Sequence, residues 1–318
     1  MLRKLKRFLC FVDDLAEVLV FHVLFSRANW KKTTVALLMC ALAFTRMAHK
    51  APVPHTPPRT TPVAVTTANT AADHAARGYD ALLKGRVNEA IRLLEMAVAG
   101  APANALYAQR LGLAYLEAGR NTQAQWTLEG AYRLSPSRTT LFYLGCVYQN
   151  LKLPDVAIGF FNQVKAAPAG DTSLAEPAAG YEAAAEAKIG ECYIKKGDYD
   201  RAIEVLTRTT LLYPNYPHAY FYLGVAHWEK GDPDLGVEQF FKVIELYPQE
   251  SAAYYNVACY YSLKGIPDLA LVWLEKALHA GFKQFTHMRS DHDLDNIRSL
   301  PAYNALVAKY QKLAPRDN

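Results

Sequence analysis

Apolar side chains recur along most of this chain at the spacing of helical neighbours, in short segments separated by turns. Leu111 and Tyr115 share one face of such a segment, and Ala124 and Leu128 share one face of the next, since residues three and four apart are neighbours on a helix. Pro136 ends the second segment, because proline removes an amide donor and disfavours helix at the residue before it. The pattern predicts units of two helices, and one such unit cannot bury its apolar face alone.

A small residue marks the same point in every unit. Successive markers lie 34, 33, 45, 34 and 34 residues apart, and they are Gly78, Gly112, Gly145, Gly190, Gly224 and Ala258. A second small residue follows each marker twelve positions later, at Ala90, Ala124, Ala157, Ala202, Gly236 and Ala270. Two small residues let the helix backbones approach closely while larger side chains fill the remaining interface. A fixed period of this length predicts a repeat solenoid.

The six units in phase resemble the tetratricopeptide repeat family, whose pattern is W-x2-L-G-x2-Y, then A-x3-F, then A and P. The fifth unit carries much of that pattern, at Tyr220, Leu223, Gly224, Gly236, Phe240 and Pro248. The resemblance implies an all-α fold, a right-handed α-α superhelical solenoid of about six helix pairs with a C-terminal capping helix.

Four parts are expected along the chain. Residues 1–50 form an amphipathic and hydrophobic membrane-targeting segment, and residues 51–71 form a Pro/Thr-rich linker. Residues 72–284 form the repeat array, and residues 285–318 form the C-terminal cap. A terminal repeat exposes an apolar face, so a cap with a polar outer side is physically required.

Two irregular segments stand out from the repeat pattern. The long 45-residue interval places an insertion near residues 166–182, which contain Pro, Gly, Ala and acidic residues typical of a surface loop. After the sixth unit, a short turn and a closing helix over about 301–313 are expected.

The N-terminal segment combines basic residues with two apolar stretches. In the first, Phe8, Phe11, Leu15 and Leu19 lie opposite three acidic residues, which suits a helix in the membrane interface. The second is an uncharged run of 13 residues that contains Leu37 and Leu38. A membrane span needs about 20 residues, so this run suits the apolar part of a signal peptide.

These features predict a membrane-associated protein with a single short N-terminal anchor. The basic leader would stay in the cytoplasm and the repeats would lie on the non-cytoplasmic side. Two alternatives remain open: a secreted or periplasmic protein after signal cleavage, and a purely peripheral helix.

Charge distribution argues against a nucleic-acid partner. The whole chain has a net charge of +5, but residues 1–60 alone carry +7 and the remaining residues carry −2. The repeats therefore lack the basic excess that phosphate-backbone binding requires.

Motifs for catalysis or metal binding are also missing from the sequence. It has no G-x-S-x-G, no phosphate-binding glycine loop and no H-E-x-x-H. None of the five cysteines forms a C-x-x-C pair, and the acidic and histidine residues at 287–295 lack an established ligand spacing. We expect no enzyme activity, no cofactor and no metal site.

In this family the concave wall comes mainly from the first helix of each unit. The resemblance implies a partner-binding groove that includes Phe142, Gln149, Asn150, Glu191, Lys195, His218, Phe221, Trp228 and Tyr255. Aromatic, amide and balanced charged side chains suit an extended or helical peptide segment. The sequence favours a non-catalytic scaffold or adaptor for a protein or peptide partner. The alternative is a regulatory or substrate-presenting subunit of a separately encoded enzyme, such as a glycosyltransferase or protease complex.

Overall fold

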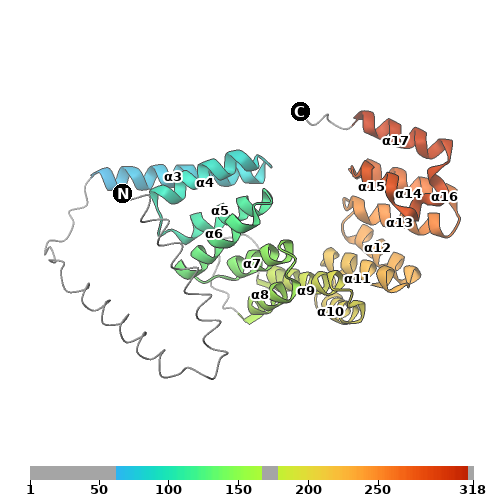
Figure 1. Ribbon diagram of the computed structural model, residues 1–318, viewed down its shortest axis with the longest axis horizontal. Helices are drawn as coiled ribbons and strands as arrows, with labels where there is room; N and C mark the ends of the chain where they lie inside the picture. Colours follow the sequence, from blue (N-terminus) through green and yellow to red (C-terminus); the bar gives the residue numbers. More distant parts are fainter. Residues whose placement is uncertain (1–61, 167–177, 314–318) are drawn as a thin grey trace, which may run out of the picture. The chain divides into compact units, whose positions relative to one another are not determined.

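The computed structural model describes residues 62–166 and 178–313, which form helices and turns without any β-strand (Figure 1). The longer helices are α3 (Pro62–Leu83), α4 (Val87–Gly100), α5 (Ala105–Glu117), α6 (Asn121–Leu134), α7 (Arg138–Asn150), α8 (Pro154–Ala166), α9 (Ala178–Lys195), α10 (Tyr199–Leu212), α11 (Pro217–Lys230), α12 (Pro233–Leu246), α13 (Ser251–Leu263), α14 (Pro267–His279) and α17 (Pro301–Leu313). Three short elements precede α17: α15 (Phe285–Ser290), η1 (His292–Leu294) and α16 (Asp295–Arg298).

Helices α3 to α14 form six consecutive pairs, each with a helix A followed by a helix B. The pairs begin with α3, α5, α7, α9, α11 and α13. Each helix packs against its partner and against the next pair, so that the buried clusters run from one unit into the next. The predicted fold class, an all-α superhelical solenoid of about six helix pairs with a closing helix, is confirmed.

Direct contact between the marker glycine and helix B explains the repeated small residue. A Cβ atom added at Gly145 would lie 2.5 Å from the Phe161 ring, and one at Gly190 would lie 2.4 Å from Leu206. Phe161 and Leu206 are fully buried. Each stands sixteen residues after its glycine, so a large helix-B side chain fills the space that the glycine leaves.

The turns between helices A and B need one left-handed residue. Glycine supplies it in five units, for example Gly119 with φ 70°, because glycine adopts positive φ without steric cost. The third unit uses Lys152 instead, with φ 61°.

Two helix starts differ from the expected boundaries. Helix α3 begins at Pro62, so residues 62–71 of the expected linker are helical; proline is well suited to the first helical turn. Helix α9 begins at Ala178, so the last part of the expected 166–182 insertion extends a helix A. The membrane residues predicted at Phe8, Phe11, Leu15, Leu19, Leu37 and Leu38 lie outside the described residues.

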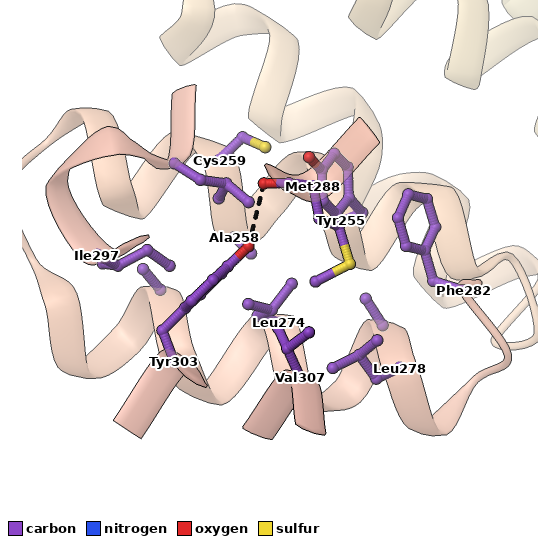
Figure 2. Packing of buried hydrophobic residues seen from close by; sticks show 13 residues of the cluster. Tyr255, Ala258, Cys259, Leu274, Leu278, Phe282, Met288, Ile297, Tyr303 and Val307 are labelled. Carbon is purple, nitrogen blue, oxygen red and sulfur yellow. Dashed lines mark hydrogen bonds between the residues drawn. The ribbon is translucent and has the colours of Figure 1, made fainter. Parts of the chain in front are cut away.

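The C-terminal elements close the apolar end of the sixth pair, as Figure 2 shows. Helix α17 spans the range expected for the closing helix. Its Tyr303 and Val307 pack with Leu274 of α14 and with Met288 of α15. The Tyr303 hydroxyl donates a hydrogen bond of 3.0 Å to the Met288 carbonyl, which satisfies both groups in a buried position.

Glycine-to-alanine substitutions test the glycine contact. Gly145→Ala should lower the free energy of unfolding by about 1–3 kcal/mol, because the new methyl group collides with Phe161. Gly159→Ala is the matched control within the same helix pair, since its methyl group would meet no atom within 4 Å. The control should raise stability by up to about 1 kcal/mol through helix propensity. Urea unfolding followed by circular dichroism measures both, and equal effects would contradict the contact.

Candidate functional site: the helix-A face

The direction of each helix-A side chain follows from its distance to the marker glycine. Successive residues turn by about 100° around a helix, so positions −2, +1 and +5 point roughly 100–160° away from the glycine. Eight residues at these positions form what we call the helix-A face: Tyr79, Arg110, Tyr143, Cys146, Lys188, Glu191, Lys195 and Tyr222. They come from α3, α5, α7, α9 and α11.

Charged and aromatic groups contact one another along this face. The Arg110 guanidinium lies 4.3 Å from the centre of the Tyr79 ring. Lys188 Nζ donates hydrogen bonds to Glu191 at 2.8 Å and to the Tyr222 hydroxyl at 3.3 Å. Lys188 and Tyr222 belong to different repeats, so the face continues from one repeat to the next.

The central charges are partly removed from water but paired. Burial disfavours the charged form of Glu191, yet Lys188 and Lys195, each 2.8 Å away, outweigh it and lower its pKa to about 2. Burial also lowers the pKa of Lys188, and the opposing effects of Tyr222 and Glu191 raise it overall. Both groups therefore stay ionised at neutral pH.

The uncharged polar groups nearby keep their protons. Burial raises the pKa of the Cys146 thiol to about 11 and also raises the pKa values of Tyr143 and Tyr222. A thiol with so high a pKa is a poor nucleophile at neutral pH. The face thus presents hydroxyl, thiol and paired ionic groups, an arrangement suited to recognising polar groups.

Comparison with known families identifies the repeats. Residues 188–251, from α9 to the start of α13, match the family model described as tetratricopeptide repeat. Within these residues, which span the fourth and fifth helix pairs, the chain carries tetratricopeptide repeats. The family supports a protein-binding role for these repeats. A search of curated proteins finds no significant match.

Three solved structures are similar to this chain, and the two with a TM-score above 0.5 share its fold. Pseudomonas aeruginosa pilF is 14% identical with a TM-score of 0.51, over 68% of this chain and 95% of that chain. The APC/C hetero-tetramer Cut9-Hcn1 is 17% identical with a TM-score of 0.55, over 76% of this chain and 43% of that chain. MamA from Desulfovibrio magneticus RS-1 is 22% identical with a TM-score of 0.45, over 57% of this chain and 97% of that chain.

Five residues of the expected groove point toward helix B. Positions −3 and +4 lie within roughly 60° of the glycine direction, and they hold Phe142, Phe221, Tyr255, Gln149 and Trp228. The centre of the Phe142 ring lies 5.6 Å from that of the buried Phe161 ring on α8. The rings of Phe221 and Trp228 have their centres 5.7 and 6.4 Å from that of Phe240 on α12. Gln149 is 6% exposed, and its Nε2 has no hydrogen-bond partner.

The other four expected groove residues point away from helix B. Glu191 and Lys195 form an ion pair on the helix-A face. Asn150 is exposed and donates a hydrogen bond of 3.3 Å to Asn121. His218 is exposed, with its ring 5.4 Å from the ring of Tyr216. The structure therefore brings Glu191 and Lys195 together as an ion pair. It also packs the rings of Phe221 and Trp228 against the same ring, that of Phe240 on α12.

The groove residues predicted from the sequence include none at position −2, two residues before the marker glycine. Arg110, Tyr143, Lys188 and Tyr222 each stand two residues before a marker glycine, and the family positions used for the groove do not include that place. Reading the sequence in this register would have found them, because all four are charged or aromatic.

Polar groups also meet where the sixth repeat joins its cap. Cys259, Asp291 and Asp293 offer ligand atoms within 4.8 Å of one another. The carboxylate oxygens of Asp291 already accept hydrogen bonds, from the Tyr255 hydroxyl at 2.5 Å and from the Asp293 backbone amide at 3.0 Å. Burial and the charge of Asp291 raise the pKa of Asp293. The cluster anchors the cap through hydrogen bonds.

Among the helices of residues 62–166 and 178–313, none has the length and hydropathy needed to cross a lipid bilayer. The expected membrane anchor lies in residues 1–50, before the first described helix.

Glu191→Gln tests the central ion pairs. Because its pKa is lowered from 4.5 to about 2, Glu191 contributes stability above pH 4.5 that is lost as the pH falls toward 2. The substitution should lower the free energy of unfolding at pH 7 by about 1–3 kcal/mol, since Lys188 loses a partner. The difference from the natural chain should shrink steadily between pH 5 and pH 2, as measured by urea unfolding. Glu204→Gln, at an exposed site on α10, should behave like the natural chain at every pH; an acid dependence unchanged in Glu191→Gln would contradict the pairing.

Proposed function

We propose that this protein is a non-catalytic scaffold or adaptor that binds a protein or peptide segment along its helix-A face. The observation that carries the proposal is the row of aromatic and charged side chains running across five successive helices A. In a tetratricopeptide repeat superhelix these helices line the concave surface, so the row would form the floor of an extended groove.

The chemistry of the row suits a peptide ligand. Tyrosine and arginine are enriched among residues that dominate binding energy, because they combine a large contact area with hydrogen bonds. The central charges nearly balance, so the face favours partners through specific polar contacts more than through a strong overall field. The exposed Lys195, Asn150 and His218 would contact the edges of the ligand.

The alternative keeps the same surface but changes the partner. A regulatory or substrate-presenting subunit of a separately encoded enzyme would also use the helix-A face. The identity of the captured partner distinguishes the two: a structural protein favours the scaffold, and an enzyme favours the subunit role.

Charge reversal on the face tests the proposal. Affinity purification of the full chain from gently solubilised cells, followed by mass spectrometry, should identify a partner that Lys195→Glu reduces about tenfold or more. Lys242→Glu makes the same charge change on helix B of the fifth repeat and should retain the partner. Circular dichroism checks that both variants stay helical. A partner set unchanged in Lys195→Glu, or reduced equally in both variants, would contradict the helix-A face.

We also propose that residues 1–50 hold the protein on a membrane, with the repeats on the non-cytoplasmic side. The proposal is supported by the charge of +7 in residues 1–60 and by the apolar stretches around Leu15 and Leu37. Membranes carrying the full chain should retain it through an alkaline carbonate wash. Complete release of uncleaved chain would contradict an inserted anchor and favour a peripheral helix. A shortened chain in the soluble fraction would favour signal cleavage.

A further inference from the structure

A cavity of about 1000 Å³ opens between the last repeats and the closing helix. Its lining comes from α12, the turn after α12, α13, α14 and α17. Of the described residues that line it, none belongs to the helix-A face. The cavity is therefore a second surface, separate from the one in the proposed function.

The path of α17 explains why this cavity exists. Tyr303, Val307 and Tyr310 follow one face of the helix, at the spacing of helical neighbours. Tyr303 is 3% exposed and Val307 is 8% exposed, whereas Tyr310 is only partly buried. The closing helix thus packs tightly at its start and less tightly toward its end, which leaves an opening beside α14.

Aromatic rings form the walls of the opening. Tyr254, Trp273 and Tyr310 come from three different helices, and the Tyr254 and Trp273 rings lie 6.0 Å apart. The Trp273 ring also packs 5.5 Å from Phe241 outside the cavity. Because its neighbours hold Trp273 in place, a ligand side chain would meet a fixed apolar wall.

One lysine of the lining has no carboxylate partner among the described residues. Lys309 forms an ion pair of 2.9 Å with Glu275. Lys276 lies 3.7 Å from the centre of the Trp273 ring, and no carboxylate of the described residues lies within ion-pair distance of it. With histidine neutral, the lysines and the glutamate give the lining a formal charge of +1.

We propose that this cavity binds an acidic peptide segment of a partner protein. A large apolar side chain of the segment packs between Trp273 and Tyr310, and a neighbouring carboxylate pairs with Lys276. Aromatic walls supply contact area at small cost in side-chain entropy. The uncompensated lysine selects acidic sequences over basic ones. The protein thereby holds one partner on the helix-A face and a second segment beside its cap.

The test uses the full chain in mild detergent and a fluorescently labelled short peptide with a central tryptophan flanked by glutamates. Two matched peptides replace the glutamates by lysines or the tryptophan by alanine. Fluorescence anisotropy should show the acidic tryptophan peptide binding about tenfold or more tightly than either matched peptide. Its affinity should also fall as salt is raised, because screening weakens the exposed ion pair.

Variants locate the binding to the cavity. Lys276→Glu and the uncharged change Tyr310→Ala should each weaken binding about tenfold or more. Lys283→Glu is the matched control, since Lys283 is exposed outside the lining and undergoes the same charge change. Lys195→Glu should leave this peptide bound, whatever it does to the helix-A partner. Equal binding of the acidic and basic peptides, equal losses in Lys276→Glu and Lys283→Glu, or no binding of the acidic peptide would each overturn the proposal.

Discussion

Five of the six repeats depend on a glycine of helix A that lies directly against a large side chain of helix B, and the sixth has the small residue Ala258 at this position. At Gly112, Gly145, Gly190 and Gly224 an added Cβ atom would lie 2.4–2.7 Å from the side chain sixteen residues later, closer than real Cβ contacts. The contact fixes the separation of the two helices and the rotation of helix A about its own axis. Once that rotation is fixed, every other position of helix A has a set direction. The direction of the helix-A face is therefore a consequence of the core.

This constraint also shows what the sequence could and could not predict. The six helix pairs and the closing helix followed from spacing, because glycine, proline and apolar periodicity act locally. The groove residues were harder to predict, because the family positions used for them include some that point toward helix B and some that point away from it. Phe142 and Gln149 lie on the glycine side and pack toward helix B, whereas Lys195 lies on the opposite side and is exposed. Pairings across repeats, such as Lys188 with Tyr222, depend on how neighbouring units stack, which no single unit encodes.

Partly buried charges on the helix-A face have a cost that apolar residues would avoid. Removing Lys188 and Glu191 from water is unfavourable, and their mutual attraction offsets that cost only while the geometry is held. Tyr222 from the next repeat and Lys195 complete the set of partners. The arrangement therefore couples α9 to α11 through polar contacts as well as through the apolar core. A surface that is already ordered loses less entropy when it binds a ligand.

The last apolar face of the sixth pair has no further repeat packed against it among the described residues, and short elements and one long helix cover it instead. Tyr303 and Val307 are buried in the core of the sixth pair, while Tyr310 packs against that core only partly buried and also lines the cavity. Had α17 packed along α14 as closely as a repeat helix does, Trp273 and Lys276 would be covered. The geometry that closes the array thus leaves an aromatic and basic cavity beside it. Trp273 and Lys276 lie on a helix B, whereas the helix-A face lies on the other helix of each pair, so one solenoid can offer two surfaces of different chemistry.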